Sequence, residues 1–123
     1  MATVLIADDD ALIRMALRLA VEQRGHTVLE AGNSDEFFDR LAESPVGLCV
    51  MDAAMPGASL SDRLDALRDG ERGAVPVAVM SGYSRPPEVV QEQGIRFLSK
   101  PLELADLDSL LTDLLRSGPG VGG

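Results

Sequence analysis

Residues 48–56 read LCVMDAAMP, and this stretch decides the fold class. The apolar run at residues 48–51 leads directly into Asp52, two alanines and a Met-Pro pair. A short run with no polar residue is typical of a strand covered on both faces, as in a parallel sheet. Ligands of such sheets bind beyond the carboxyl ends of the strands. Asp52 is therefore the first candidate for a functional site.

Strand-like and helical patterns alternate along the whole chain. Glu30 and Arg96 place the second and fifth apolar runs nearer the sheet edges. Strand-helix units repeated in this way predict an α/β fold, a doubly wound five-stranded parallel sheet with helices on both faces. The predicted strands are residues 3–7, 27–31, 48–51, 76–80 and 95–98, and the predicted helices are residues 12–24, 33–44, 61–68, 86–94 and 104–115.

Composition excludes several classes of protein. A chain of 123 residues fits one domain, and a hydrophobic share of 46% suffices for a core. The net charge of −9 argues against a nucleic-acid partner, and no apolar run approaches the ~20 residues of a membrane span. The lone cysteine, Cys49, agrees with a reducing, cytoplasmic location. We expect a domain at residues 1–117 and a flexible Gly-rich tail at 118–123.

Polar residues follow the predicted strands at one rim of the sheet. Asp8 and Asp9 follow the first strand, Asp52 the third, Ser81 the fourth and Lys100 the fifth. Carboxylates about 5 Å apart repel by roughly 3 kcal/mol per pair at an effective dielectric near 20, so a divalent cation between them is favourable. An oxygen-only ligand set suits Mg²⁺. Cation, ammonium and hydroxyl can together neutralise a transferring phosphoryl group, which a carboxylate can accept.

These motifs, in this order, resemble the receiver domain of the two-component response-regulator family over nearly the whole chain. The family fold is flavodoxin-like, with strand order 2-1-3-4-5. The resemblance rests on Asp8-Asp9, Asp52 before Met55-Pro56, Ser81, Phe97 and Lys100-Pro101.

The resemblance implies a phosphorelay function rather than a conventional enzyme. Asp52 would take a phosphoryl group from the phosphohistidine of a histidine kinase or a phosphotransfer protein. Mg²⁺ would be bound by Asp9, Asp52 and the backbone carbonyl of Ala54, with Asp8 acting largely through water. The domain would catalyse its own phosphorylation and its own slow dephosphorylation.

Further roles follow from the same resemblance. Lys100 would pair with the phosphate, and Ser81 would move to hydrogen-bond it. Phe97 would turn inward as the switch residue, remodelling the face of the fourth helix, fifth strand and fifth helix for a downstream protein. Ala54 and Tyr83 occupy positions that tune hydrolysis of the acyl phosphate. A bond in the cis form at Lys100-Pro101 would fix the direction of the lysine.

Simpler readings stand beside these. Asp8, Asp9 and Asp10 could be acids favoured by a helix N-terminus, and we assign Asp10 to such a cap, outside the site. Packing alone could explain Phe97. The Asp8-x-Asp10 spacing also suits a haloacid-dehalogenase-like phosphatase, which would leave Asp52 before Met-Pro unexplained. Two further alternatives are a receiver-like interaction module that is never phosphorylated and a flavodoxin-like cofactor carrier.

Overall fold

The computed structural model describes residues 2–69, 75–82 and 85–116. Tyr83, the predicted tail and the end of the expected domain at residue 117 lie outside the described residues. In chain order the elements are β1 (Thr3–Ala7), α1 (Ala11–Gln23), β2 (Thr27–Ala31), α2 (Ser34–Glu43), β3 (Leu48–Asp52), α3 (Leu60–Arg68), β4 (Val77–Ser81), α4 (Glu88–Gln93), β5 (Arg96–Ser99) and α5 (Leu104–Arg116).

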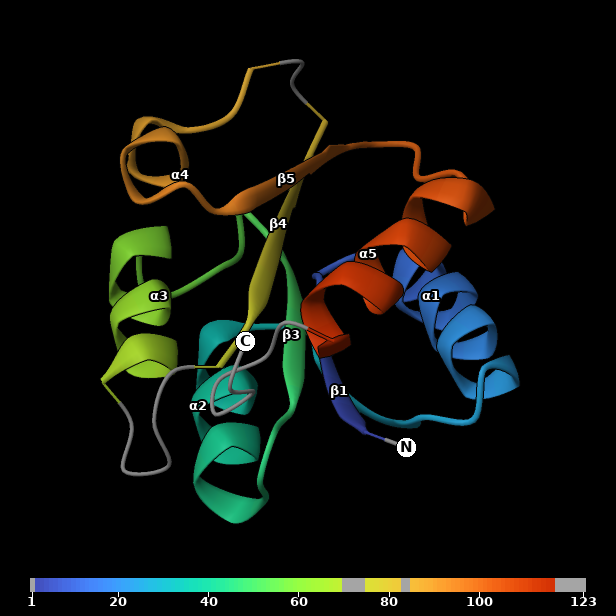
Figure 1. The fold of residues 1–123 in the computed structure, drawn as a ribbon. Coiled ribbons are helices and arrows are strands. Elements are labelled where there is room, and N and C mark those ends of the chain that lie inside the picture. The colour runs from blue at the N-terminus through green and yellow to red at the C-terminus, as the bar shows by residue number, and fades with distance from the viewer. Residues whose placement is uncertain (1, 70–74, 83–84, 117–123) are drawn as a thin grey trace.

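The strands form one parallel sheet in the order β2-β1-β3-β4-β5. Helices α1 and α5 cover one face, and α2, α3 and α4 cover the other (Figure 1). The predicted doubly wound architecture is therefore confirmed, with strands β2 and β5, which carry Glu30 and Arg96, at the edges. Where chain order reverses in such a sheet, between β1 and β3, the loops part and leave room for a site.

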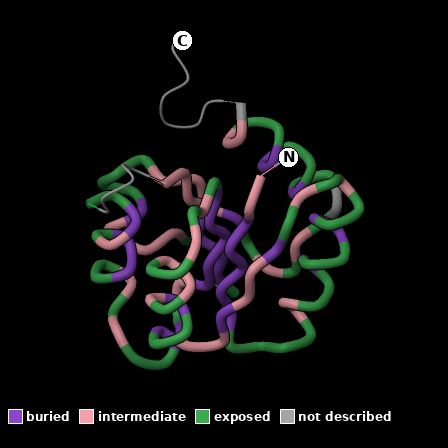
Figure 2. Tube along the Cα trace, turned by 90° about the horizontal axis from the view of Figure 1, so that it is seen from below, coloured by how far each residue is buried: buried purple, intermediate pink, exposed green. Residues whose placement is uncertain are grey.

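The core has two halves, one on each face of the sheet. Strand periodicity sends Val4 and Ile6 to the α1–α5 side and Leu5 to the opposite side. The central strands are buried almost throughout, while the outward faces of the helices remain exposed (Figure 2). Burial on both faces explains why the strand sequences lack an alternating polar pattern.

Three strands extend or shift by one residue relative to the predicted bounds. Strand β3 includes Asp52, and β4 ends at Ser81, because these residues still pair with the neighbouring strand, Asp52 opposite Met80 and Ser81 opposite Ser99. The ladder continues through the backbone N–H of Lys100, which donates to the Ser81 carbonyl at 2.8 Å. Asp52 and Ser81 therefore stand on ladder residues, whose backbone the sheet holds in place.

Local signals end the helices as the sequence indicates. Asp10 caps α1 through its side chain, which accepts hydrogen bonds from the N–H groups of Leu12 and Ile13, so its assignment as a cap is confirmed. Pro87 precedes α4, and Gly94 ends it with φ 65°, a left-handed conformation that glycine adopts without steric cost. In the described part of the chain, no helix has both the length and the apolar character needed to cross a bilayer.

Candidate functional site

Four strand ends deliver polar side chains to the same rim of the sheet. Asp52 and Ser81 are the last residues of β3 and β4, and Asp8 and Lys100 directly follow β1 and β5. Parallel strands point their carboxyl ends the same way, so residues distant in sequence meet there. Asp52, Asp8 and Lys100 are brought into direct contact, as the sequence predicts.

Three carboxylates form the acidic part of the site. One oxygen from each of Asp8, Asp9 and Asp52 lies within 4.8 Å of the other two. Asp8 is fully buried, Asp52 is 8% exposed and Asp9 is exposed. At such separations each pair repels by roughly 3 kcal/mol at an effective dielectric near 20. The cluster therefore favours a bound cation.

Lys100 neutralises part of this charge. Its Nζ lies 2.7 Å from Oδ2 of Asp52 and 2.8 Å from Oδ2 of Asp8. Burial lowers the pKa of the ammonium, but hydrogen bonds to Asp52 and Asp8 outweigh that effect, and the pKa of Lys100 rises above its ordinary value. The Lys100-Pro101 peptide bond is in the cis form. Lys100 thus holds a full positive charge between two of the three carboxylates.

The environment of Asp8 opposes its ionisation. Burial raises the pKa of its carboxyl above the usual value, although Lys100 and the backbone N–H of Asp10, which donates to Oδ1 at 2.8 Å, act in the opposite direction. The negative charge of Asp52 adds to the increase. A second cation near Asp8 would therefore be electrostatically favourable.

Both oxygens of Asp52 have defined neighbours. The backbone N–H of Ala54 donates to Oδ1 at 3.1 Å, and Lys100 contacts Oδ2. These contacts set the plane of the carboxylate and place Ala54 beside it at the start of the β3–α3 loop. Asp9, in contrast, pairs with no basic side chain within the described ranges.

The two expected switch residues lie close to the rim. Ser81 is 4% exposed, and its carbonyl binds the backbone of Lys100. Phe97 is half-buried on β5 opposite Val79 and packs against the core on the α2–α3–α4 side. Position alone supports either a switch or a packing role for Phe97. The second residue predicted to tune hydrolysis, Tyr83, lies outside the described residues.

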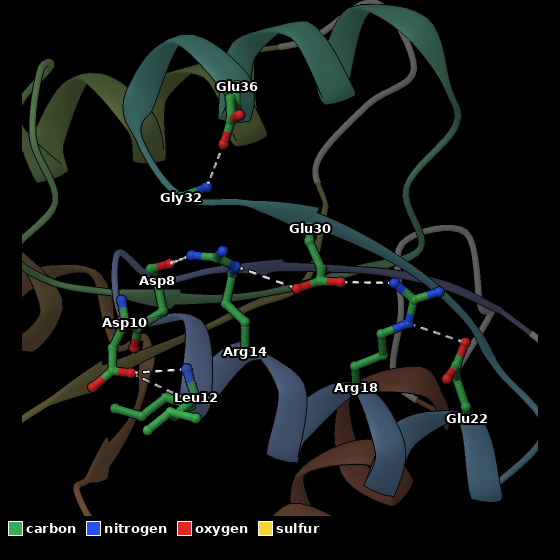
Figure 3. A network of polar contacts seen from close by, with 10 residues as sticks. Asp8, Asp10, Leu12, Arg14, Arg18, Glu22, Glu30, Gly32 and Glu36 are labelled. Atoms are coloured by element: carbon green, nitrogen blue, oxygen red, sulfur yellow. Dashed lines mark hydrogen bonds and ion pairs between the residues drawn. The ribbon is translucent and has the colours of Figure 1, made fainter.

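Sequence reasoning missed two arginines that support the site from behind. Arg14 Nη1 donates to the Asp8 carbonyl at 2.6 Å and its Nε to Glu30 at 3.2 Å, and Arg18 continues the network from Glu30 to Glu22 (Figure 3). A basic residue in the first turns of a helix opposes the helix dipole. This unfavourable position was the signal in the sequence that Arg14 interacts with a group outside its own helix.

The second is Arg63, whose guanidinium donates to the carbonyls of Asp52 and Ala53. It occupies the apolar stripe of α3 together with Leu60, Leu64 and Leu67. A charged residue on a stripe that must be buried was the signal in the sequence.

Comparison with known proteins identifies the family. A family model described as the response regulator receiver domain matches residues 4–112. The chain belongs to this family. Membership of the receiver family argues against the two alternatives from other families, the haloacid-dehalogenase-like phosphatase and the flavodoxin-like cofactor carrier. An interaction module that is never phosphorylated would still be a variant of a receiver, so that alternative is left to experiment.

Curated relatives carry the domain as part of larger proteins. The receiver domain is 33% identical over 117 residues to the sensory/regulatory protein RpfC of Xanthomonas campestris, covering 90% of this chain and 16% of that protein. It is 30% identical over 125 residues to the phosphate regulon transcriptional regulatory protein PhoB of Pseudomonas aeruginosa, covering 96% of this chain and 54% of that protein. The chain thus spans well under two thirds of these relatives.

Solved structures agree over almost their full length. A response regulator receiver protein from Pseudomonas putida superposes with a TM-score of 0.81 at 32% identity, covering 92% of this chain and 97% of that one. The receiver domain of the hybrid histidine kinase CckA gives a TM-score of 0.74 at 26% identity, covering 92% and 98% of the two chains.

Proposed function

We propose that this receiver domain accepts a phosphoryl group on Asp52 from a phosphohistidine of a histidine kinase or a phosphotransfer protein. One observation carries the proposal: the Asp52 carboxylate stands among Asp8, Asp9 and Lys100, with a carboxylate cluster and an ammonium beside it. This is the arrangement that phosphoryl transfer needs, because the transferring group carries negative charge that must be neutralised on several oxygens.

The acidic cluster fits a divalent cation, and Mg²⁺ is the ion we propose. Asp8, Asp9 and Asp52 supply only oxygen, and Asp9 is exposed to solvent, which suits an ion that keeps several waters. The backbone carbonyl of Ala54 is the further protein ligand that we propose. When bound, Mg²⁺ supplies charge neutralisation for the phosphoryl oxygens and orients the group relative to Asp52.

The reaction at Asp52 is a displacement at phosphorus. A carboxylate oxygen forms the new O–P bond while the P–N bond to the donor imidazole breaks, and the electron pair of that bond stays with the imidazole nitrogen. Lys100 compensates charge on the phosphoryl oxygens. The signal ends by hydrolysis. Water attacks phosphorus, the O–P bond to Asp52 breaks, inorganic phosphate leaves with the protons of the water, and the carboxylate is restored. This self-catalysed loss is the only hydrolytic activity that we propose.

Phosphorylation would be read out at the face of α4, β5 and α5. The added phosphate brings about −1.5 to −2 charges and three acceptor oxygens to the rim. We propose that the Ser81 hydroxyl donates to one of these oxygens and that Phe97 turns inward as Ser81 moves. The half-buried position of Phe97 supports this, because its ring can gain further burial. A downstream protein would bind the remodelled face.

The phosphohistidine donor would approach over α1. Leu12, Met15 and Leu19 are 74%, 55% and 55% exposed and recur at helical spacing on one face of α1. Beside them runs an apolar groove of about 400 Å³, lined by residues of α1 and by Lys100, Pro101 and Leu102. An exposed apolar face continuous with the site suits a partner whose histidine must reach Asp52. The donor's contact with α1 is part of the proposed function.

The residue that follows the phosphoacceptor by two positions bears on how long the phosphoryl group stays on Asp52. Ala54 offers no polar side chain to orient an attacking water. We therefore propose slow hydrolysis. A cytoplasmic location completes the proposal, since a kinase that draws on ATP supplies the phosphohistidine.

The test is the intact mass of the protein after incubation with acetyl phosphate and Mg²⁺. The wild-type protein gains the mass of one phosphoryl group, and the gain disappears without Mg²⁺ and in Asp52→Asn. Asp8→Asn is the companion variant. If Asp8→Asn gains no phosphoryl group while Asp52→Asn still gains one, the nucleophile is Asp8, as in the phosphatase alternative. A wild-type protein that gains no mass from any small phosphodonor supports the unphosphorylated interaction module.

A further inference from the structure

Arg63 is a buried cation directly behind the phosphoacceptor. It is 1% exposed, and its side chain reaches from α3 to the end of β3. Nη1 donates to the Asp52 carbonyl at 2.9 Å and lies 3.1 Å from the sulfur of Met51, and Nη2 donates to the Ala53 carbonyl at 2.9 Å. One planar group therefore clamps two successive peptide units.

In the part of the chain that the structure describes, no carboxylate side chain contacts this cation. Within the described residues Arg63 forms no ion pair, and its buried Nε donates to none of them. Burial lowers the pKa of the guanidinium, while the proximity of Cys49 and Asp52 counters that decrease. Arginine remains protonated in proteins, so a full positive charge stands in the core. A buried, unpaired charge lowers stability, and an apolar residue of similar size is often equal or better there.

The clamp lies where the site needs fixed geometry. The two carbonyls belong to the phosphoacceptor and the next residue, and Ala54 follows, whose N–H already holds Oδ1 of Asp52. Residues that orient the groups in direct contact with a metal are important for function. Their substitution commonly lowers activity or metal affinity by about 10- to 100-fold. Phosphorylation adds negative charge to Asp52, and a cation behind its backbone is placed to offset that addition.

We propose that Arg63 is a positioning residue of the receiver site, holding the Asp52–Ala53 backbone and offsetting the charge gained when Asp52 is phosphorylated. This inference rests on the proposed function, because it presumes that Asp52 is the acceptor. Arg63 acts through the backbone of Asp52 and Ala53 and does not itself touch the reacting atoms.

The experiment compares Arg63→Met, Arg63→Lys and Arg68→Met with the wild-type protein. Arg68 is the matched control, because it is an exposed arginine of the same helix. The first readout is the rate of phosphorylation by acetyl phosphate at saturating Mg²⁺. We expect a loss of about 10- to 100-fold in Arg63→Met and partial recovery in Arg63→Lys, which keeps the charge but not the planar clamp. Arg68→Met should match the wild type.

The second readout separates positioning from mere stability. Mg²⁺ with beryllium fluoride, a mimic of the phosphoryl group, should raise the Tm of the wild type and of Arg68→Met by equal amounts. The rise should be at least halved in Arg63→Met, whatever its starting Tm. A purely structural arginine would shift the starting Tm and leave the rise unchanged, and that result overturns the proposal.

The remaining outcomes are also decisive. If Arg63→Met does not fold, Arg63→Lys decides: a wild-type rate with a wild-type Tm rise overturns the proposal, and intermediate values support it. If the wild type is phosphorylated and Arg63→Met reacts equally fast, only the role of Arg63 fails. If the wild type neither gains a phosphoryl group nor responds to beryllium fluoride, the proposed function fails and this inference fails with it.

Discussion

The Nζ of Lys100 lies 2.7 Å from Oδ2 of Asp52, although 48 positions separate the two residues in the chain. The same nitrogen lies 2.8 Å from Oδ2 of Asp8. Lys100 is the only lysine of the sequence, so its behaviour can be followed without interference from other lysine side chains. Its position makes it both a structural counter-charge for two carboxylates and a competitor for any cation that binds them.

Replacing Lys100 by Met should expose these two roles. Without Mg²⁺ near pH 7, the buried Asp8 and Asp52 lose their counter-charge, and the free energy of unfolding should fall by about 2–3 kcal/mol. Mg²⁺ should then stabilise Lys100→Met more than the wild type, because a competing cation is gone. Urea denaturation with and without Mg²⁺ measures both effects. Equal stability of the two proteins without Mg²⁺ would contradict the structural role.

Asp9 should contribute to Mg²⁺ binding, whereas its neighbour Asp10 should not. Asp9→Asn removes one of the clustered carboxylates, and we expect the Kd for Mg²⁺ to rise about tenfold or more. Asp10→Asn removes the same charge one residue away and leaves a residue that also caps helices well. Titration calorimetry of the two variants compares a ligand with a cap. Equal losses of affinity would show that only the total charge matters.

The spacing of apolar residues, together with glycine and proline at the ends of the elements, was sufficient to predict the fold. Uninterrupted runs such as residues 48–51 become strands buried on both faces, and Gly94 ends α4 in a left-handed conformation, as its position indicated. The bounds of β3, β4 and β5 were one residue off, because Asp52, Ser81 and Ser99 continue the ladder although their side chains are polar. Pairing between strands is not encoded in the pattern of a single strand.

The site residues that follow strands could be predicted from the sequence. The residue that reaches the site from a packed helix could not. Asp8, Asp52 and Lys100 meet because parallel strands share a direction. Arg63 reaches the Asp52 carbonyl only because α3 lies close enough to β3 for a long side chain to span the distance. Sequence spacing gives no measure of that distance, so the clamp emerged from the structure.

Gly57 should be required in the β3–α3 loop for two separate reasons. Its φ of +102° is unfavourable for any other residue, and a Cβ there would lie 2.8 Å from the Cβ of Ser34. Gly57→Ala should therefore lower the free energy of unfolding by about 2–4 kcal/mol, measured by urea denaturation. Adding Ser34→Gly should restore only part of this, since the clash is relieved and the backbone strain remains.

Gly82→Ala is the control for this loop variant. A Cβ at Gly82 would meet no atom within 4 Å, and the backbone there needs no positive φ. Its substitution should change the free energy of unfolding by less than about 0.5 kcal/mol. If Gly57→Ala were equally mild, the loop would have to adopt a different backbone conformation from the one described.

His26 should make stability depend on pH in a defined direction. It is the only histidine, its Nδ1 accepts a hydrogen bond from the backbone N–H of Ala2 at 3.1 Å, and partial burial lowers its pKa below 6.5. Because folding favours the neutral ring, the stability that His26 contributes is fully present at a pH above the pKa of the unfolded state. It is lost as the pH falls through that value toward the lower pKa of the folded state. Proton NMR of the single C2–H signal gives the folded pKa, and denaturation from pH 7.5 to 5.5 gives the slope, which His26→Asn should reduce. A folded pKa above 6.5 would contradict the prediction.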